Sequence, residues 1–192
     1  MSLIYNGLAL FLLMLAGGVA APAAARAEAP AGNEVYLVVD LSERMLYVMR
    51  GDEVVGDYQV AVGKPEHPTP TGEFRIRRLV WNPRWVPPEA KWARGKRARA
   101  PGDPRNPMGR VKIFFSDPDY YIHGTREVDS LGEAESHGCV RMRNADVIAL
   151  AKTVMETGGA RREPAWYKRV VNRVTRTQEV RLSNAVRVTV RK

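Results

Sequence analysis

The chain has 192 residues, of which 45% are hydrophobic, 27% charged and 8% aromatic. This is the composition of an ordinary globular protein, and it excludes a wholly disordered chain, a collagen-like chain and a membrane protein with many spans. The 30 Lys and Arg residues outnumber the 21 Asp and Glu residues, which gives a net charge of +9. Most of the excess lies in residues 161–192, and such a basic segment attracts polyanions of any kind.

The N-terminal segment predicts export. Residues 8–16 are apolar, and Ala25-Arg26-Ala27 fits the small-residue rule for a cleavage site. We expect residues 1–27 to be a signal peptide, with a retained anchor as the alternative. The folded part would then lie in the periplasm or cell envelope, where nucleic acid is not an expected partner.

Patterns of β-branched and apolar residues separated by turn residues predict the strands that follow. They cover residues 35–40, 44–50, 54–62, 73–76, 111–115 and 120–122. The first three of them predict a meander of antiparallel strands. Residues 81–107 contain three tryptophans and no regular period, so we expect a long surface loop there, either a functional flap or an insertion that covers a sheet edge.

One helix is predicted over residues 144–155. Asn144 is a suitable N-cap, the stripe from Val147 to Val154 is apolar, and Gly158 would end the helix. Residues 170–192 alternate again, so part of the basic tail is expected to complete the sheet. The sequence thus predicts a mostly β domain over residues 33–158 and a basic C-terminal extension over residues 159–192 that adds a strand to it.

Reactive side chains concentrate in residues 121–125 and 136–141. Cys139 is the only cysteine, so it is a buried small hydrophobe, an intermolecular link or a working thiol. A nucleophilic thiol needs a neighbouring base or cation, and two of the three histidines, His123 and His137, lie within sixteen positions. We therefore favour a working thiol. The third histidine, His67, is expected to decorate a loop, and Gly138 would let a substrate backbone approach closely.

Zinc is the alternative use of these residues. His123, His137 and Cys139 could supply three ligands of a catalytic site, but their spacing is not a recognised zinc signature. We expect no metal and no cofactor.

The two segments resemble the L,D-transpeptidase catalytic-domain family of bacterial peptidoglycan enzymes. Its signature is a histidine, a spacer, Ser/Thr-His-Gly-Cys, an apolar residue and Arg or Asn. Here His123 precedes, by a spacer of twelve residues, the run Ser136-His137-Gly138-Cys139-Val140-Arg141. The resemblance also includes residues 38–42, 63–64, 69–74 and 106–109, and it covers roughly residues 34–155. It implies a mostly β, antiparallel and sandwich-like catalytic fold with one main helix after the cysteine motif.

The resemblance also implies roles for the site residues. Cys139 would attack a peptide carbonyl and form a thioester, His123 would be the general base, and the Gly124 carbonyl would orient it. Arg141 would hold a substrate carboxylate or brace the loop, and we favour bracing slightly. The oxyanion and active-site loop is assigned to the backbone around Cys139 with Ser136, His137 and Gly138, and the candidate substrate-binding residues are Arg141, Thr125 and Tyr121.

The implied substrate is the peptidoglycan stem tetrapeptide, which would lose D-Ala and be joined to the amine of a second stem in a 3-3 cross-link. Water as acceptor would make the protein an L,D-carboxypeptidase, and a protein lysine would make it a wall-attachment enzyme. The basic tail would bind anionic wall polymers or the membrane surface, and we expect a monomer. A non-catalytic wall-binding module and a zinc peptidase remain as alternatives from other classes.

Overall fold

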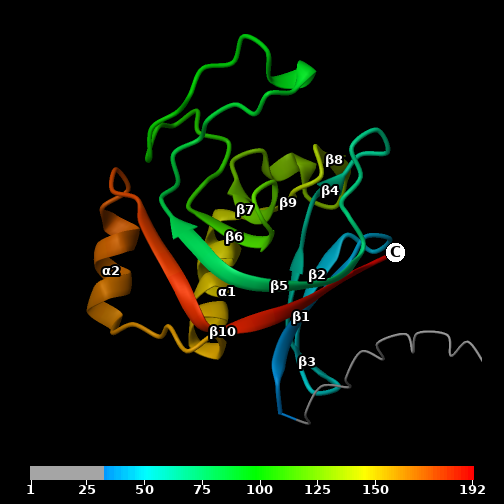
Figure 1. The fold of residues 1–192 in the computed structure, drawn as a ribbon, viewed down its shortest axis with the longest axis vertical. Helices are drawn as coiled ribbons and strands as arrows, with labels where there is room; N and C mark the ends of the chain where they lie inside the picture. Colours follow the sequence, from blue (N-terminus) through cyan, green and yellow to red (C-terminus); the bar gives the residue numbers. More distant parts are fainter. Residues whose placement is uncertain (1–32) are drawn as a thin grey trace, which may run out of the picture.

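A computed structural model describes residues 33–192, and the predicted signal or anchor at residues 1–27 lies outside the described residues (Figure 1). The described chain forms one sheet of eight strands in the order β3-β2-β1-β10-β5-β6-β7-β9, together with a small pair, β4 and β8. The mostly β fold class predicted from the sequence is confirmed.

The predicted strands are present, although several of their ends differ. The strands are β1 (Val35–Asp40), β2 (Met45–Arg50), β3 (Glu53–Gln59), β4 (Val62–Gly63), β5 (Gly72–Trp81), β6 (Val111–Ser116), β7 (Tyr120–Thr125), β8 (Ala134–Ser136), β9 (Val140–Arg143) and β10 (Gln178–Arg191). The predicted strand over residues 54–62 ends at Gln59, because the Ala61 backbone leaves β2 and bonds to the Arg141 backbone. The strand predicted at residues 73–76 extends to Trp81.

The sheet is mixed. The predicted antiparallel meander holds for β1, β2 and β3, but β1 runs parallel to β10 and β7 runs parallel to β9. Parallel neighbours require a long connection. Residues 126–139, which include a short 3-10 helix at Val128–Ser130 and the strand β8, supply it between β7 and β9.

The basic tail forms β10, which lies between β1 and β5 in the middle of the sheet (Figure 1). Its pairing with β5 shifts register between Arg181 and Val186, so that the strand bends there. Val186, Val188 and Val190 are buried, as the alternation of apolar and polar residues requires.

The helix α1 (Asn144–Thr157) follows the cysteine motif and packs against β6, β7, β9 and β10. Its apolar stripe is buried in the core, where each fully buried aliphatic side chain contributes about 1.5–3 kcal/mol. It ends at Gly158 as predicted. The N-cap prediction for Asn144 is wrong, because Arg143 occupies the cap position without a side-chain hydrogen bond.

A second helix, α2 (Pro164–Asn172), was not predicted because its surface is mostly polar. Pro164 begins it, a position that suits proline. The Trp166 ring contacts Trp81 edge-on at a centroid distance of 5.9 Å, and the Tyr167 ring contacts it at a tilt at 6.1 Å. These contacts attach the helix to the core. Neither helix of residues 33–192 has the length and apolar character needed to cross a bilayer.

Candidate active site

Three neighbouring strands bring the two reactive segments together. In the sheet register, His123 on β7 lies between Lys112 on β6 and Arg141 on β9. Side chains two positions apart on a strand point to the same face, which places Tyr121 on the face of His123. Cys139 directly precedes β9 and lines the same cleft as His123. The opposite face carries the core residues Ile113, Ile122 and Val140. The alternation that builds the core therefore also assembles the polar site.

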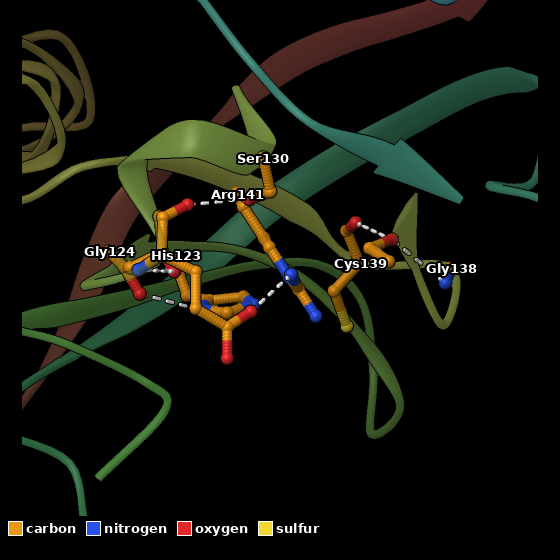
Figure 2. A network of polar contacts seen from close by, with 9 residues as sticks. His123, Gly124, Ser130, Gly138, Cys139 and Arg141 are labelled. Atoms are coloured by element: carbon orange, nitrogen blue, oxygen red, sulfur yellow. Dashed lines mark hydrogen bonds and ion pairs between the residues drawn. The ribbon is translucent and has the colours of Figure 1, made fainter. Parts of the chain in front are cut away.

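His123 is held as a neutral ring. It is 3% exposed, and its Nδ1 lies 2.8 Å from the Gly124 carbonyl oxygen (Figure 2). Because a carbonyl only accepts, Nδ1 carries the proton. Burial lowers the pKa of His123 to about 3, the Gly124 carbonyl opposes this, and the charges of Arg141 and Lys112 lower it further. Nε2 is therefore unprotonated at neutral pH, the state in which imidazole acts as a base.

Cys139 is half-buried, and its Sγ lies 3.4 Å from the Asp119 carbonyl oxygen. Burial raises the pKa of the thiol. The Tyr121 backbone N–H and hydroxyl and the charge of Lys112 act in the opposite direction but do not outweigh burial. The thiol is thus protonated at neutral pH, and it needs a proton acceptor before it can act as a nucleophile.

Ser136 stabilises the turn that carries the cysteine. Its Oγ donates to the Cys139 carbonyl at 2.5 Å and accepts from the Gly138 N–H at 3.1 Å (Figure 2). The predicted oxyanion donor at Gly138 is therefore occupied in this arrangement, whereas the N–H groups of His137 and Cys139 have no acceptor among residues 33–192. Gly138 has a φ of +103°, and a Cβ there would approach the Tyr120 ring to 2.8 Å. The fold itself thus requires glycine at this position.

The three candidate substrate-binding residues have different environments. Arg141 Nη1 forms an ion pair of 2.8 Å with Glu127, an arrangement that favours bracing of the loop. Thr125 is buried, and its Oγ1 accepts from the Glu127 N–H at 3.0 Å, so this hydroxyl also serves the loop. Tyr121 contacts the His123 ring edge-on at 5.5 Å, and burial raises the pKa of its hydroxyl.

Asn144 braces the end of β7 instead of capping α1. Its Oδ1 accepts from the Arg110 N–H at 2.9 Å, and its Nδ2 donates to the Thr125 carbonyl at 3.0 Å. The amide lies so close to Gly124 that a Cβ there would approach Oδ1 to 2.3 Å. Gly124 is therefore required for this packing, which fixes the backbone whose carbonyl orients His123.

The long loop at residues 81–107 forms a wall of the site. The Trp92 ring stacks on the His137 ring with a centroid distance of 4.0 Å and an interplanar angle of 19°. His67 lies in a loop as expected, but its ring is only 5.1 Å from that of His137. The cleft has a volume of about 120 Å³ and is lined by Trp85, Trp92, Lys96, Pro107, Met108, His123, Ser136, His137, Cys139 and Arg141. This arrangement favours a functional flap over an edge-covering insertion.

Sequence reasoning missed Lys112. Its Nζ lies 4.2 Å from the centroid of the Tyr121 ring and makes no hydrogen bond or ion pair within residues 33–192. Burial lowers the pKa of Lys112 to about 8, and a Cys139 thiolate would raise it. The available signal was a single lysine between Val111 and Ile113 in an otherwise apolar strand.

The zinc alternative does not fit the geometry. Among residues 33–192, no three His, Cys, Asp or Glu side chains lie close enough together to hold one metal ion. His123, His137 and Cys139 therefore do not form the set that this alternative requires.

A family model for the L,D-transpeptidase catalytic domain, named YkuD, matches residues 34–176. The chain belongs to this family, and the resemblance inferred from the sequence is confirmed. Among family proteins, YqjB of Bacillus subtilis is 34% identical over 132 residues, which cover 66% of this chain and 70% of YqjB. YkuD of the same species is 35% identical over 119 residues, which cover 62% of this chain and 60% of YkuD.

Similarity to solved structures supports the fold alone. An L,D-transpeptidase from Mycobacterium smegmatis matches with a TM-score of 0.51 at 18% identity, covering 83% of this chain and 59% of that protein. L,D-transpeptidase 3 from Mycobacterium tuberculosis gives a TM-score of 0.50 at 16% identity, with 84% and 62% covered. The chain thus spans about three fifths of these proteins.

Proposed function

We propose that this chain is an exported cysteine L,D-transpeptidase that acts on peptidoglycan stem tetrapeptides. The observation that carries the proposal is the neutral His123, whose Nδ1 is fixed on the Gly124 carbonyl and whose ring lines the same cleft as Cys139. Together they supply a nucleophile, a base and an orienting group.

In the first half of the reaction, Cys139 Sγ attacks the carbonyl carbon between the L-centre and D-Ala, and His123 Nε2 takes the thiol proton. The carbonyl oxygen becomes an oxyanion, for which the His137 and Cys139 N–H groups are the free donors of the turn. When the C–N bond breaks, the imidazolium returns its proton to the departing amine. The products are free D-Ala and a thioester on Cys139.

In the second half, the side-chain amine of another stem attacks the thioester. His123 takes a proton from the amine, the C–S bond breaks, and the thiolate recovers its proton. One amide bond is exchanged for another, which gives a 3-3 cross-link without an external energy source. Water in place of the amine gives a tripeptide, and a protein lysine gives an attached protein.

Lys112 supports the nucleophile electrostatically. The neutral thiol becomes anionic in the transition state, and the half-buried Lys112 ammonium is the cation that acts on it most strongly, followed by Arg141. A charge held in a partly desolvated site acts more strongly than one in water. Lys112 thus favours the thiolate over the thiol, and the same charge lowers the pKa of the base His123.

Export and wall binding belong to the same proposal. A signal or anchor at residues 1–27 would deliver the domain to the cell envelope. The basic tail also presents exposed arginines that form no ion pair within residues 33–192, including Arg169 and Arg176, and these suit anionic wall polymers or the membrane surface. In this proposal the protein acts as a monomer.

The test is the intact mass of the full chain after incubation with tetrapeptide muropeptides, with Cys139→Ala and His123→Ala as controls. We expect a mass increase equal to the tripeptide acyl group on the wild-type protein, release of D-Ala, and no adduct on Cys139→Ala. A cross-linked dimer in the product identifies an amine acceptor, and a free tripeptide identifies water. A wild-type protein that gives no adduct and no product, while its thiol reacts normally with iodoacetamide, would overturn the proposal in favour of a wall-binding module.

A further inference from the structure

A second cavity lies further along the same strands. It has a volume of about 450 Å³ and is lined by Asn82, Gly102, Asp103, Asn106, Gly109, Arg110, Thr125, Arg126, Val128, Arg143, Asn144, Ala145 and Val174. The loop segment 106–109 separates it from the cleft of Cys139, because Asn106 and Gly109 line the cavity whereas Pro107 and Met108 line the cleft.

Its position follows from the register. Thr125 lies opposite Arg143, two residues beyond the pair of His123 and Arg141. Arg143 is the last residue of β9, and Cys139 directly precedes this strand. At about 3.3 Å per residue, the strand from Val140 to Arg143 is about 10 Å long, a distance that about three extended peptide residues span.

The cavity contains positive charge without a matching negative charge. Arg110 is half-buried, and its guanidinium donates to the Asn82 side chain and the Val171 carbonyl, both of which are neutral. Arg126 is exposed and forms no ion pair within residues 33–192, and Arg143 has only a 3.8 Å contact with Asp146.

The single carboxylate that lines the cavity does not neutralise these arginines. Asp103 has its own cationic partners, Arg99 at 3.8 Å and Arg105 at 3.6 Å. Arg141, the cation nearest along β9, is already paired with Glu127. Arg126, which has no ion pair within residues 33–192, and Arg110, whose partners are neutral, thus leave positive charge for a ligand, and Arg143 adds a third cation that is paired only at 3.8 Å.

We propose that this cavity binds a carboxylate of the stem peptide whose reacting bond lies at Cys139. The inference rests on the proposed function, and it adds a subsite and its ligand chemistry. Stem peptides carry carboxylates, and the planar guanidinium matches a carboxylate with two parallel hydrogen bonds. The spacing of about 10 Å lets one extended peptide reach both places.

The subsite acts in binding and not in bond breaking. Arg126 and Arg143 lie beyond the cleft that contains the thiol, so their removal weakens substrate binding and leaves the bond-breaking step unchanged. A carboxamide in place of the carboxylate removes the same interaction from the substrate side.

The experiment uses the full chain as wild type, as the double variant Arg126→Gln/Arg143→Gln, and as Arg50→Gln, an exposed control arginine at the end of β2. D-Ala release is measured with a tetrapeptide muropeptide and with the same muropeptide after its non-terminal carboxylates are converted to carboxamides. Iodoacetamide labelling of Cys139 reports the integrity of the site.

We expect the double variant to raise KM for the acid substrate about tenfold, with kcat and the labelling rate near wild type. The KM of the wild type should rise by a similar factor with the amidated substrate. The KM of the double variant should rise little further with that substrate, because the two changes remove the same interaction. A double variant that distinguishes acid from amide as wild type does would overturn the subsite. If wild type releases no D-Ala from either substrate, the proposed function fails, and the subsite fails with it.

Discussion

Acid is expected to destabilise the fold through His123. The pKa of this buried ring is lowered to about 3, whereas an unfolded histidine titrates near 6.5. The unfolded state therefore binds the proton first, so the stability is complete above about pH 6.5 and decreases as the pH falls toward 3. At pH 4.5, about two pH units below the pKa of the unfolded histidine, the free energy of unfolding is lower by about 3 kcal/mol, because each pH unit contributes about 1.36 kcal/mol.

The assay is urea unfolding at pH 7.5 and pH 4.5 for the wild-type protein and for His123→Asn. Asparagine does not titrate, and its amide can still donate to the Gly124 carbonyl. We expect the wild type to lose about 3 kcal/mol more than the variant over this interval. Burial also lowers the pKa of His137, but that histidine is present in both proteins, so its contribution cancels.

Equal losses in the two proteins would refute the reasoning. They would mean that His123 takes up its proton in the folded state at an ordinary pKa. Such a ring would be partly charged near neutral pH, so that only part of the protein would hold it in the neutral form that accepts the thiol proton. The measurement therefore tests the proposed base without substrate.

Three further predictions concern the surroundings of the nucleophile. Lys112→Met should move the pH profile of iodoacetamide labelling of Cys139 to higher pH, because it removes the cation that favours the thiolate. In Trp92→Ala, Cys139 should react with iodoacetamide faster than in the wild type. The indole stacks on His137 and lines the cleft of Cys139, so its removal opens that cleft to the reagent. Asn144→Ala should lower the free energy of unfolding in urea by about 1–3 kcal/mol, since two hydrogen bonds are lost, and should lower kcat by disturbing Gly124.

Each of these predictions has a contradicting outcome. An unchanged labelling profile for Lys112→Met would show that its ammonium does not act on the thiol. Slower or unchanged labelling of Trp92→Ala would show that the loop does not restrict access. A wild-type kcat in Asn144→Ala, together with reduced stability, would show that the Asn144 hydrogen bonds stabilise the fold but are not needed to position His123.

The reactive residues could be found from the sequence because they are rare and lie close together in the chain. His123 and Cys139 are separated by sixteen positions, and the turn from Ser136 to Gly138 is local. The strand ends were harder to predict, because pairing with distant strands decides them. β5 extends to Trp81 because β6 and β10 pair with its second half, although residues 77–78 are arginines.

Lys112 and Trp92 could not be assigned for a related reason. Lys112 is the neighbour of His123 only through the antiparallel register of β6 and β7. Trp92 reaches His137 from 45 positions away across an irregular loop. Asn144 was misassigned because a favourable local role, the N-cap, competes with a tertiary one, and the tertiary contacts prevail.

The register of three strands also determines the chemistry. A slip of one residue between β7 and either neighbour would move His123 into the core and Ile122 to the surface, which the buried apolar face forbids. The core side chains thus fix the distances between nucleophile, base and the more distant cations. Truncating a buried residue such as Ile122 should therefore reduce catalysis beyond its cost in stability, because the residue maintains the alignment of both polar segments.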